Sequence, residues 1–143
     1  MGGPFLPEAE LQFLDIRDFS NRDERGIVYF PFQNLPASLP IHEMCASCHI
    51  ISIEPGHIRG QHHHPGKTEW LLLVHGTGQL FWRTRDGEIQ QRLLDDFKTL
   101  VVIPPGIPHT LRNEGADPLY LFAWRAALSS GKDEPDTVPA ALI

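Results

Sequence analysis

Three histidines and one glutamate, in two short segments, form the clearest chemical pattern in this sequence. His62 and His64 are two residues apart, so in an extended segment both side chains lie on one face, and Glu69 follows just beyond a Pro-Gly turn. His109 lies in a second, proline-rich segment, residues 104–109. Neutral imidazoles with one carboxylate suit Zn, Fe, Mn, Ni or Cu. The pattern therefore predicts one divalent metal ion per chain, held by these four side chains, if the fold brings them together.

Short β-rich segments, separated by turns that contain glycine or proline, must position these side chains. The segments are residues 27–30, 41–53, 70–74, 78–83, 89–93, 99–103, 110–113 and 119–124. Asp86-Gly87 is the strongest hairpin signal among the turns, because both residues tolerate a positive φ. Many short strands with such turns indicate an all-β sandwich or small barrel, here preceded by a short helical or irregular segment within residues 8–19.

Length and composition fit a single domain. The chain has 143 residues, of which 41% are hydrophobic. A domain of this size buries roughly 70% of the surface that its unfolded chain exposes, which is enough for a proper core. We divide the chain into an N-terminal extension that packs on the barrel (1–20), the barrel itself (21–128) and a polar C-terminal tail (129–143).

The charge of the chain narrows the class of partner. A formal net charge of −6 and a pI near 5.7 argue against nucleic acid and anionic membranes and favour a small-molecule substrate. The first ten residues contain no basic region followed by an apolar run, and no apolar stretch approaches the roughly 18 to 20 residues that cross a bilayer. We therefore expect a cytoplasmic protein without a membrane partner, whose two cysteines form no disulfide framework.

The two histidine-containing segments resemble the two sequence motifs of the cupin superfamily. The matching residues are Gly56, His62, His64, Glu69, Gly76, Pro104, Gly106, His109 and Asn113. The resemblance implies a small jelly-roll (cupin) β-barrel that binds a divalent metal in its mouth, although Lys98 stands where the second motif has a glycine. By strand alternation, His63 should face away from the site. A metal-free barrel that keeps these histidines for packing or acid–base chemistry is the alternative.

A longer match narrows the resemblance within the superfamily. Residues 59–69 resemble the Arg-Gly-x-His-x-His … Lys-x-Glu segment of sugar-nucleotide cupins, and above all the C-terminal cupin domain of capsular-polysaccharide epimerase/reductase enzymes. This resemblance implies an isomerase or epimerase of polysaccharide biosynthesis that abstracts a proton next to the ketone of a keto-sugar nucleotide. A metal-dependent Fe dioxygenase and a non-catalytic metabolite-binding protein are the alternatives, because one barrel hosts many chemistries.

The general base of such a reaction is not obvious from the sequence. His62 matches the base of the metal-free epimerases, but a metal ligand cannot readily serve as a base as well. Other candidates for the base and the acid are His57, His75, Tyr29 and Tyr120. Arg59 and Lys67 flank the first motif and are candidates for binding a substrate diphosphate.

Residues 45–49 match the pattern for covalent haem attachment. Haem attachment requires an exported, usually helical segment. This one follows no signal and lies in an expected strand, where Cys45 and Cys48 would project to opposite faces. We therefore expect no haem and interpret both cysteines as buried thiols.

Residues 70–74 are apolar on both faces, whereas a strand with only one face on the barrel interior should alternate. Trp70, Leu72 and Val74 would then need cover from the N-terminal segment or from a second subunit. This feature, together with the habit of the cupin family, predicts a homodimer.

Overall fold

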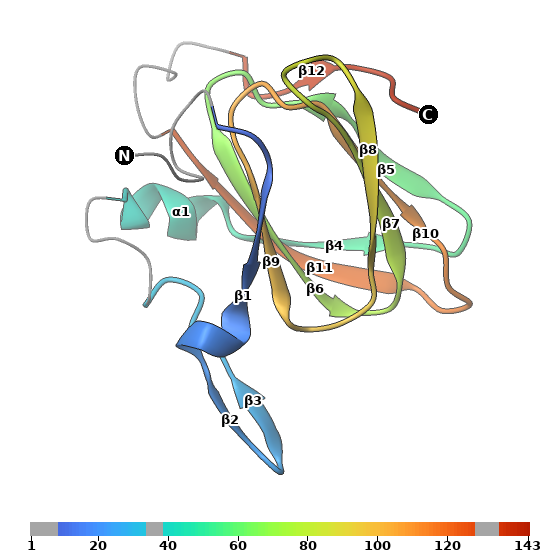
Figure 1. Cartoon of the computed structure of the whole chain (residues 1–143). Coiled ribbons are helices and arrows are strands. Elements are labelled where there is room, and N and C mark those ends of the chain that lie inside the picture. The colour runs from blue at the N-terminus through green and yellow to red at the C-terminus, as the bar shows by residue number, and fades with distance from the viewer. Residues whose placement is uncertain (1–8, 34–38, 128–134) are drawn as a thin grey trace.

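The computed structural model describes residues 9–33, 39–127 and 135–143. Antiparallel strands form two facing five-stranded sheets that enclose the core of a small jelly-roll barrel (Figure 1). A short 3₁₀ helix, η1 (Ile16–Phe19), lies near the start of the chain. The all-β jelly-roll (cupin) class, with a short helical or irregular N-terminal segment, is therefore confirmed.

The two sheets contain strands that are far apart in the sequence. In spatial order, the first sheet contains β1 (Gln12–Asp15), β9 (Thr99–Ile103), β6 (Thr68–His75), β11 (Leu119–Ala126) and β4 (His49–Ile53). The second contains β12 (Val138–Pro139), β5 (Ile58–His63), β10 (His109–Asn113), β7 (Gly78–Arg83) and β8 (Ile89–Leu94). The hairpin of β2 (Asn21–Asp23) and β3 (Gly26–Val28) projects away from both sheets (Figure 1).

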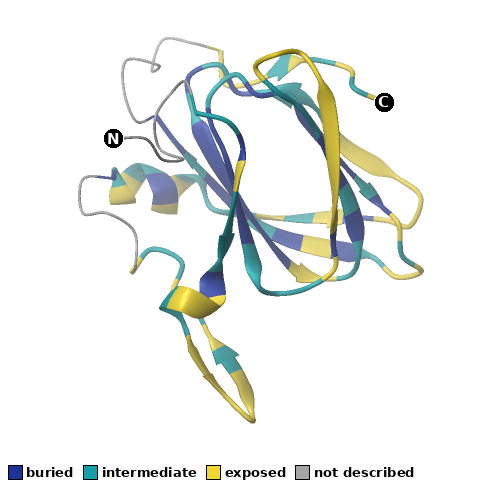
Figure 2. Ribbon diagram, viewed as in Figure 1, coloured by how far each residue is buried: buried dark blue, intermediate teal, exposed yellow. Residues whose placement is uncertain are grey.

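The central strand β6 is buried on both faces by its own chain (Figure 2). Leu71 and Leu73 belong to the cluster between the two sheets, whereas Trp70 and Leu72 belong to a second cluster on the outer face. The outer cluster also contains Ile16, Leu39, Met44, Leu100, Val102, Trp124 and Ala126. The N-terminal segment and the later helix α1 (Ile41–Ser47) therefore cover the outer face of β6. Val74, near the end of the strand, stays exposed.

The Asp86-Gly87 hairpin is confirmed. Strands β7 and β8 pair antiparallel around it, and the Thr84 amide donates to the Glu88 carbonyl at 2.8 Å. Gly87 adopts a φ of +90°, the left-handed conformation that the turn requires.

The strand predicted over residues 41–53 is wrong in its first half. Residues Ile41–Ser47 form a helix, α1, and β4 begins only at His49. The helix starts after Pro40, buries Met44 in the outer cluster and lets the Glu43 carboxylate accept from the Ala127 amide at 2.6 Å. These tertiary contacts override a sequence that is ambiguous between helix and strand.

The helix also changes the interpretation of the two cysteines. Cys45 is exposed and Cys48 is only partly buried, so the prediction of two buried strand thiols is wrong. The strand alternation that would have placed them on opposite faces does not apply to a helix and its C-cap.

The ends of the described chain lie against the two sheets. Strand β1 is an edge strand of the first sheet, and β12 is an edge strand of the second. Residues 1–8 of the predicted extension and 129–134 of the predicted tail lie outside the described residues, and the division at residues 20 and 128 stays a prediction. None of the helices in the described ranges is long and apolar enough to cross a membrane.

Candidate metal centre

The fold brings the four predicted ligands together near the end of the barrel where β12 lies. His62 lies on β5, His64 directly follows that strand, and His109 begins β10 opposite His62. Glu69 comes from β6 in the facing sheet. One potential ligand atom from each of the four lies within 4.8 Å of the others, so the cluster bridges the two sheets.

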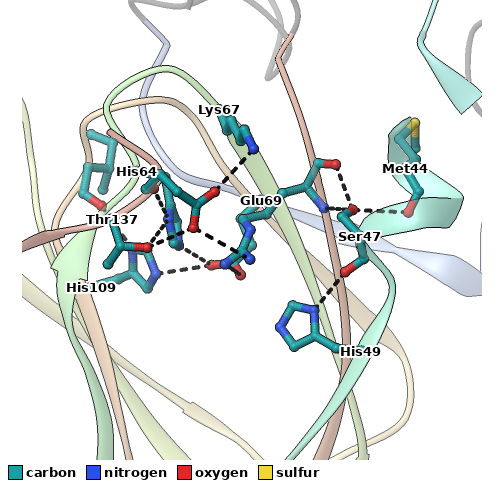
Figure 3. Close-up of polar contacts among 11 residues, drawn as sticks. Met44, Ser47, His49, His64, Lys67, Glu69, His109 and Thr137 are labelled. Atoms are coloured by element: carbon teal, nitrogen blue, oxygen red, sulfur yellow. Dashed lines mark hydrogen bonds and ion pairs between the residues drawn. The ribbon is translucent and has the colours of Figure 1, made fainter. Parts of the chain in front are cut away.

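The imidazoles of His64 and His109 are oriented by backbone carbonyls (Figure 3). The Nδ1 atom of His64 lies 2.7 Å from the Asp136 carbonyl oxygen, and that of His109 lies 2.9 Å from the Ile107 carbonyl oxygen. A carbonyl only accepts, so each Nδ1 carries a proton, and in the neutral form of the ring the Nε2 atom then presents a lone pair. Such second partners commonly hold metal-ligating histidines in position.

The two Nε2 atoms converge on one carboxylate oxygen. Oε1 of Glu69 lies 3.3 Å from His64 Nε2 and 3.1 Å from His109 Nε2. Both nitrogens are buried, yet neither makes a hydrogen bond of acceptable geometry. Buried polar atoms without a hydrogen bond are costly, and a shared cation would satisfy both of them together with the carboxylate.

Protonation states in the cluster match those of metal ligands. Burial would raise the pKa of Glu69, but the neighbouring His109 and His64 outweigh it when their imidazoles are protonated, so the net shift is downward and the carboxylate is ionised. Burial, with contributions from His109 and His64, lowers the pKa of His62 to about 4. His62 is therefore neutral at pH 7, as coordination requires.

A cavity of about 690 Å³ in the barrel opens onto this cluster, and His62, Glu69 and His109 form part of its wall. Its volume falls within the range of roughly 300 to 1,000 Å³ that is typical of small-molecule sites. Much of the remaining wall is apolar. Its other polar lining residues are His49, Ser52, Arg59, Thr110 and Arg125.

Arg125 and His49 are site residues that the sequence did not single out. Arg125 lies on β11 opposite Glu69, and its Nη1 atom is 3.7 Å from Glu69 Oε2. It therefore places a positive charge beside the Glu69 carboxylate and in the cavity wall. Arg125 stands in an otherwise apolar strand, so only the register of β11 against β6 identifies its role.

The predicted base and acid candidates lie outside the cavity wall. His57 is exposed in the turn before β5, and the rings of His75 and Tyr120 neighbour each other, 6.1 Å apart, in exposed positions. Tyr29 packs against Phe19 in the outer cluster, where burial raises its pKa to about 12. The geometry brings none of these four side chains to the four ligands.

The two predicted substrate-binding residues and His63 occupy different places. Arg59 lines the cavity, and its Nε atom donates to the Ser52 carbonyl at 2.9 Å. Lys67 does not line the cavity and instead pairs with Asp136 at 3.1 Å. His63 is not part of the ligand cluster.

Residues 136–142 lie along β5, the strand that leads to the histidine ligands. Strand β12 pairs with His62 and His63, and the Ala140 amide donates to the Gln61 carbonyl at 2.7 Å. The side chain of Gln61 also accepts from the Leu142 amide at 2.7 Å. These bonds hold Gln61 at its left-handed φ of 58° and keep the Asp136 carbonyl against His64.

A chain that ends at residue 134 is expected to bind a divalent ion about 10 to 100 times more weakly than the full chain, because His64 loses the carbonyl that orients it. A chain that ends at residue 140 keeps that carbonyl and should bind normally. Titration against a chromophoric chelator measures both affinities. Equal affinities for the two shortened chains would contradict the role assigned to Asp136.

The fold and the site define a jelly-roll barrel with a histidine-and-glutamate cluster beside an internal cavity. The sequence model for the polysaccharide biosynthesis C-terminal domain matches residues 39–138, and the chain belongs to this family. A comparison with curated proteins gave no match.

Solved structures similar to this chain include those of two kinds of protein. The capsular polysaccharide assembling protein CapF of Staphylococcus aureus matches with a TM-score of 0.59 at 25% identity over 87% of this chain and 34% of CapF. Another CapF structure matches with a TM-score of 0.58 at 27% identity over 66% of this chain and 26% of CapF. The chain thus spans between a quarter and about a third of CapF.

Sugar ketoisomerases share the fold over most of their length. A 3,4-ketoisomerase of Helicobacter canadensis matches with a TM-score of 0.67 at 15% identity over 90% of this chain and 89% of the enzyme. QdtA, a sugar 3,4-ketoisomerase of Thermoanaerobacterium thermosaccharolyticum, matches with a TM-score of 0.66 at 17% identity over 90% of this chain and 87% of that enzyme. At these identities the likeness concerns the fold alone.

Proposed function

We propose that this chain is a cupin that holds one divalent metal ion and isomerises or epimerises a keto-sugar nucleotide in polysaccharide biosynthesis. The observation that carries the proposal is the convergence of His62, His64, Glu69 and His109 within 4.8 Å at a cavity of about 690 Å³. Membership of the polysaccharide biosynthesis family and the likeness to CapF support the pathway.

The four residues fit a resident divalent ion. The buried Nε2 atoms of His64 and His109 make no acceptable hydrogen bond, and the carboxylate of Glu69 lies between them. Ligands of this type suit Zn, Fe, Mn, Ni or Cu. When bound, such an ion supplies a Lewis acid at the cavity wall.

The residues around the ligands suit an anionic, oxygen-rich substrate. The guanidinium of Arg125 lines the cavity beside Glu69 and can stabilise negative charge that develops on a substrate oxygen. Arg59 offers a second cation on the same wall for a diphosphate. Apolar side chains such as Leu71 and Leu121 limit the access of water to the reacting carbon.

The substrate class has support from the proteins that share the fold. QdtA has been solved in complex with TDP, and a variant of QdtA in complex with TDP-4-keto-6-deoxyglucose. We therefore take nucleoside-diphosphate keto-sugars as the class for testing on this chain, with proton transfer next to the ketone as the reaction.

Metal-loaded protein in D₂O is expected to incorporate deuterium next to the ketone of a supplied keto-sugar nucleotide, as read by NMR. Removal of the metal with a chelator, or the His62→Ala substitution, should abolish the incorporation. No incorporation above the protein-free rate with any of a panel of such nucleotides would overturn the proposal. Oxygen uptake by iron-loaded protein would favour a dioxygenase instead, and tight binding without turnover would favour a metabolite-binding module.

A further inference from the structure

The proposed reaction needs a proton acceptor that is not a metal ligand. Among the described residues that line the cavity, the histidines are His49, His62 and His109, and the last two belong to the ligand cluster. We propose that His49 is the catalytic base that takes the proton from one carbon of the substrate and protonates the next. This inference rests on the proposed function and names the residue that performs its central step.

His49 faces the interior of the barrel from the edge strand β4. His49, Ile51 and Ile53 alternate along β4, and Ile51 and Ile53 pack in the cluster between the two sheets, whereas Ile50 is 74% exposed. Across the sheet, His49 pairs with Ala123 of β11, and Ala123 in turn pairs with Leu71 of β6. The small side chain of Ala123 leaves space over the sheet beside the imidazole.

The metal ligands lie only a short way along the same sheet. Glu69 of β6 pairs with Arg125 of β11. This pair lies two residues along the two strands from the Leu71–Ala123 pair, which is level with His49. Figure 3 shows the His49 ring directed toward the side on which Glu69 and His109 lie. A sugar held against the ligand cluster therefore lies within the part of the cavity that His49 faces.

The protonation pattern of His49 suits a base. Its Nδ1 atom lies 2.8 Å from the Ser47 carbonyl oxygen, which can only accept, so in the neutral ring Nδ1 carries the proton and Nε2 carries the lone pair. Within the described residues, Nε2 has no hydrogen-bond partner, which leaves it available to a substrate.

Ser47 itself is fixed by several hydrogen bonds. Its Oγ accepts from the Arg125 amide at 2.7 Å and lies 2.7 Å from the Arg125 carbonyl and 3.0 Å from the Met44 carbonyl (Figure 3). The backbone that orients the His49 ring is thereby tied to the strand that carries Arg125. Such a fixed base needs little reorganisation before it accepts a proton.

One base on one face is sufficient for a ketoisomerisation. Nε2 of His49 takes the proton from the carbinol carbon next to the ketone, and the electron pair of that C–H bond forms a C=C bond while the carbonyl oxygen takes up negative charge near Arg125. The imidazolium exchanges its proton with solvent and then protonates the former carbonyl carbon, so that in D₂O deuterium enters at that carbon. The hydroxyl proton of the first carbon passes through solvent to the second oxygen, so carbonyl and carbinol exchange places without any oxidant or reductant.

The test compares His49→Gln with the matched substitution His42→Gln on the exposed surface of α1. Glutamine can still donate to the Ser47 carbonyl but cannot accept a proton at neutral pH. We expect His49→Gln to retain its metal content, its affinity for TDP and its KM, while kcat and the rate of deuterium incorporation fall about 10²- to 10⁴-fold. His42→Gln should behave as wild type.

The outcomes separate this inference from the function on which it rests. If wild type incorporates deuterium and His49→Gln does so at the same rate, the assignment of His49 is overturned and the proposed function stands. If wild type incorporates none, both are overturned. Should His49→Gln fail to fold or to hold metal, ¹⁵N-histidine spectra of the wild type decide: the Nε2 resonance of His49 should shift when a keto-sugar nucleotide binds, and an unmoved resonance would overturn the assignment.

Discussion

Wild-type protein is expected to unfold about 10 °C higher in saturating Zn²⁺ than in a chelator, and His64→Ala to show no such difference. An ion that binds only the folded state adds about 4 kcal/mol of stability when its free concentration is about a thousand times its Kd. For a domain of about 150 residues, each kcal/mol raises the melting temperature by roughly 2 to 4 °C. We expect the gain to require His64, because its buried ring lies 3.3 Å from Glu69 through Nε2 and 2.7 Å from the Asp136 carbonyl through Nδ1.

His63→Ala provides the matched control, since His63 lies between two ligands without belonging to their cluster. It should keep one ion per chain by elemental analysis and keep the thermal shift, whereas His64→Ala should lose both. A shift of wild-type size in His64→Ala would remove this residue from the ligand set. The metal site itself would be refuted if the wild type gained no stability from Zn²⁺, Fe²⁺, Mn²⁺, Ni²⁺ or Cu²⁺.

The cluster of His62, His64, Glu69 and His109 could be predicted from the sequence because its signal is local. His62 and His64 follow the two-residue alternation of a strand, and the spacing to Glu69 and the proline-rich segment around His109 match a known motif. The structure adds what spacing cannot show, namely that the Nδ1 atoms of His64 and His109 are held by carbonyls and that their Nε2 atoms meet at Glu69.

The residues around this cluster could not be predicted from the sequence, because they lie in distant parts of the chain. Arg125 reaches Glu69 only through the register of β11 against β6, and Asp136 reaches His64 only because β12 pairs with β5. His49 was hidden for a different reason. It follows a helix where the sequence predicts a strand, and it belongs to the residues 45–49 that match a haem-attachment pattern.

The outer face of strand β6 is covered, as the sequence predicts, but only the structure shows which segments cover it. Residues 70–74 are apolar on both faces, which correctly predicts that other residues pack on the outer face. The sequence does not indicate which segment these residues come from. Ile16 and Met44 of the same chain pack in the outer cluster with Trp70 and Trp124, whose stacked rings lie 6.0 Å apart. Strand β6 therefore gives no support to a homodimer, which stays a prediction from the family resemblance.

Gly60→Ala is expected to damage both stability and metal binding. Gly60 has a φ of +106°, and an added Cβ would lie 2.7 Å from the His109 carbonyl oxygen and 2.9 Å from the Cα of Thr110. It sits where the pairing of β5 and β10 shifts register, between the pairs that contain His62–His109 and Gly60–Thr110. Forcing these two backbones apart should cost about 1 to 3 kcal/mol beyond the strain of a left-handed alanine, and it should separate two of the four ligands.

Gly87→Ala is the control that separates the strain of a positive φ from the clash between β5 and β10. Gly87 has a similar φ of +90°, but nothing lies within 4 Å of an added Cβ. Both variants therefore carry the backbone strain, and only Gly60→Ala carries the clash with β10. Urea unfolding should show the larger loss for Gly60→Ala, and chelator competition should show weaker metal binding in that variant alone. Equal losses in the two variants would mean that the close approach of β5 and β10 at Gly60 does not set the geometry of His62 and His109.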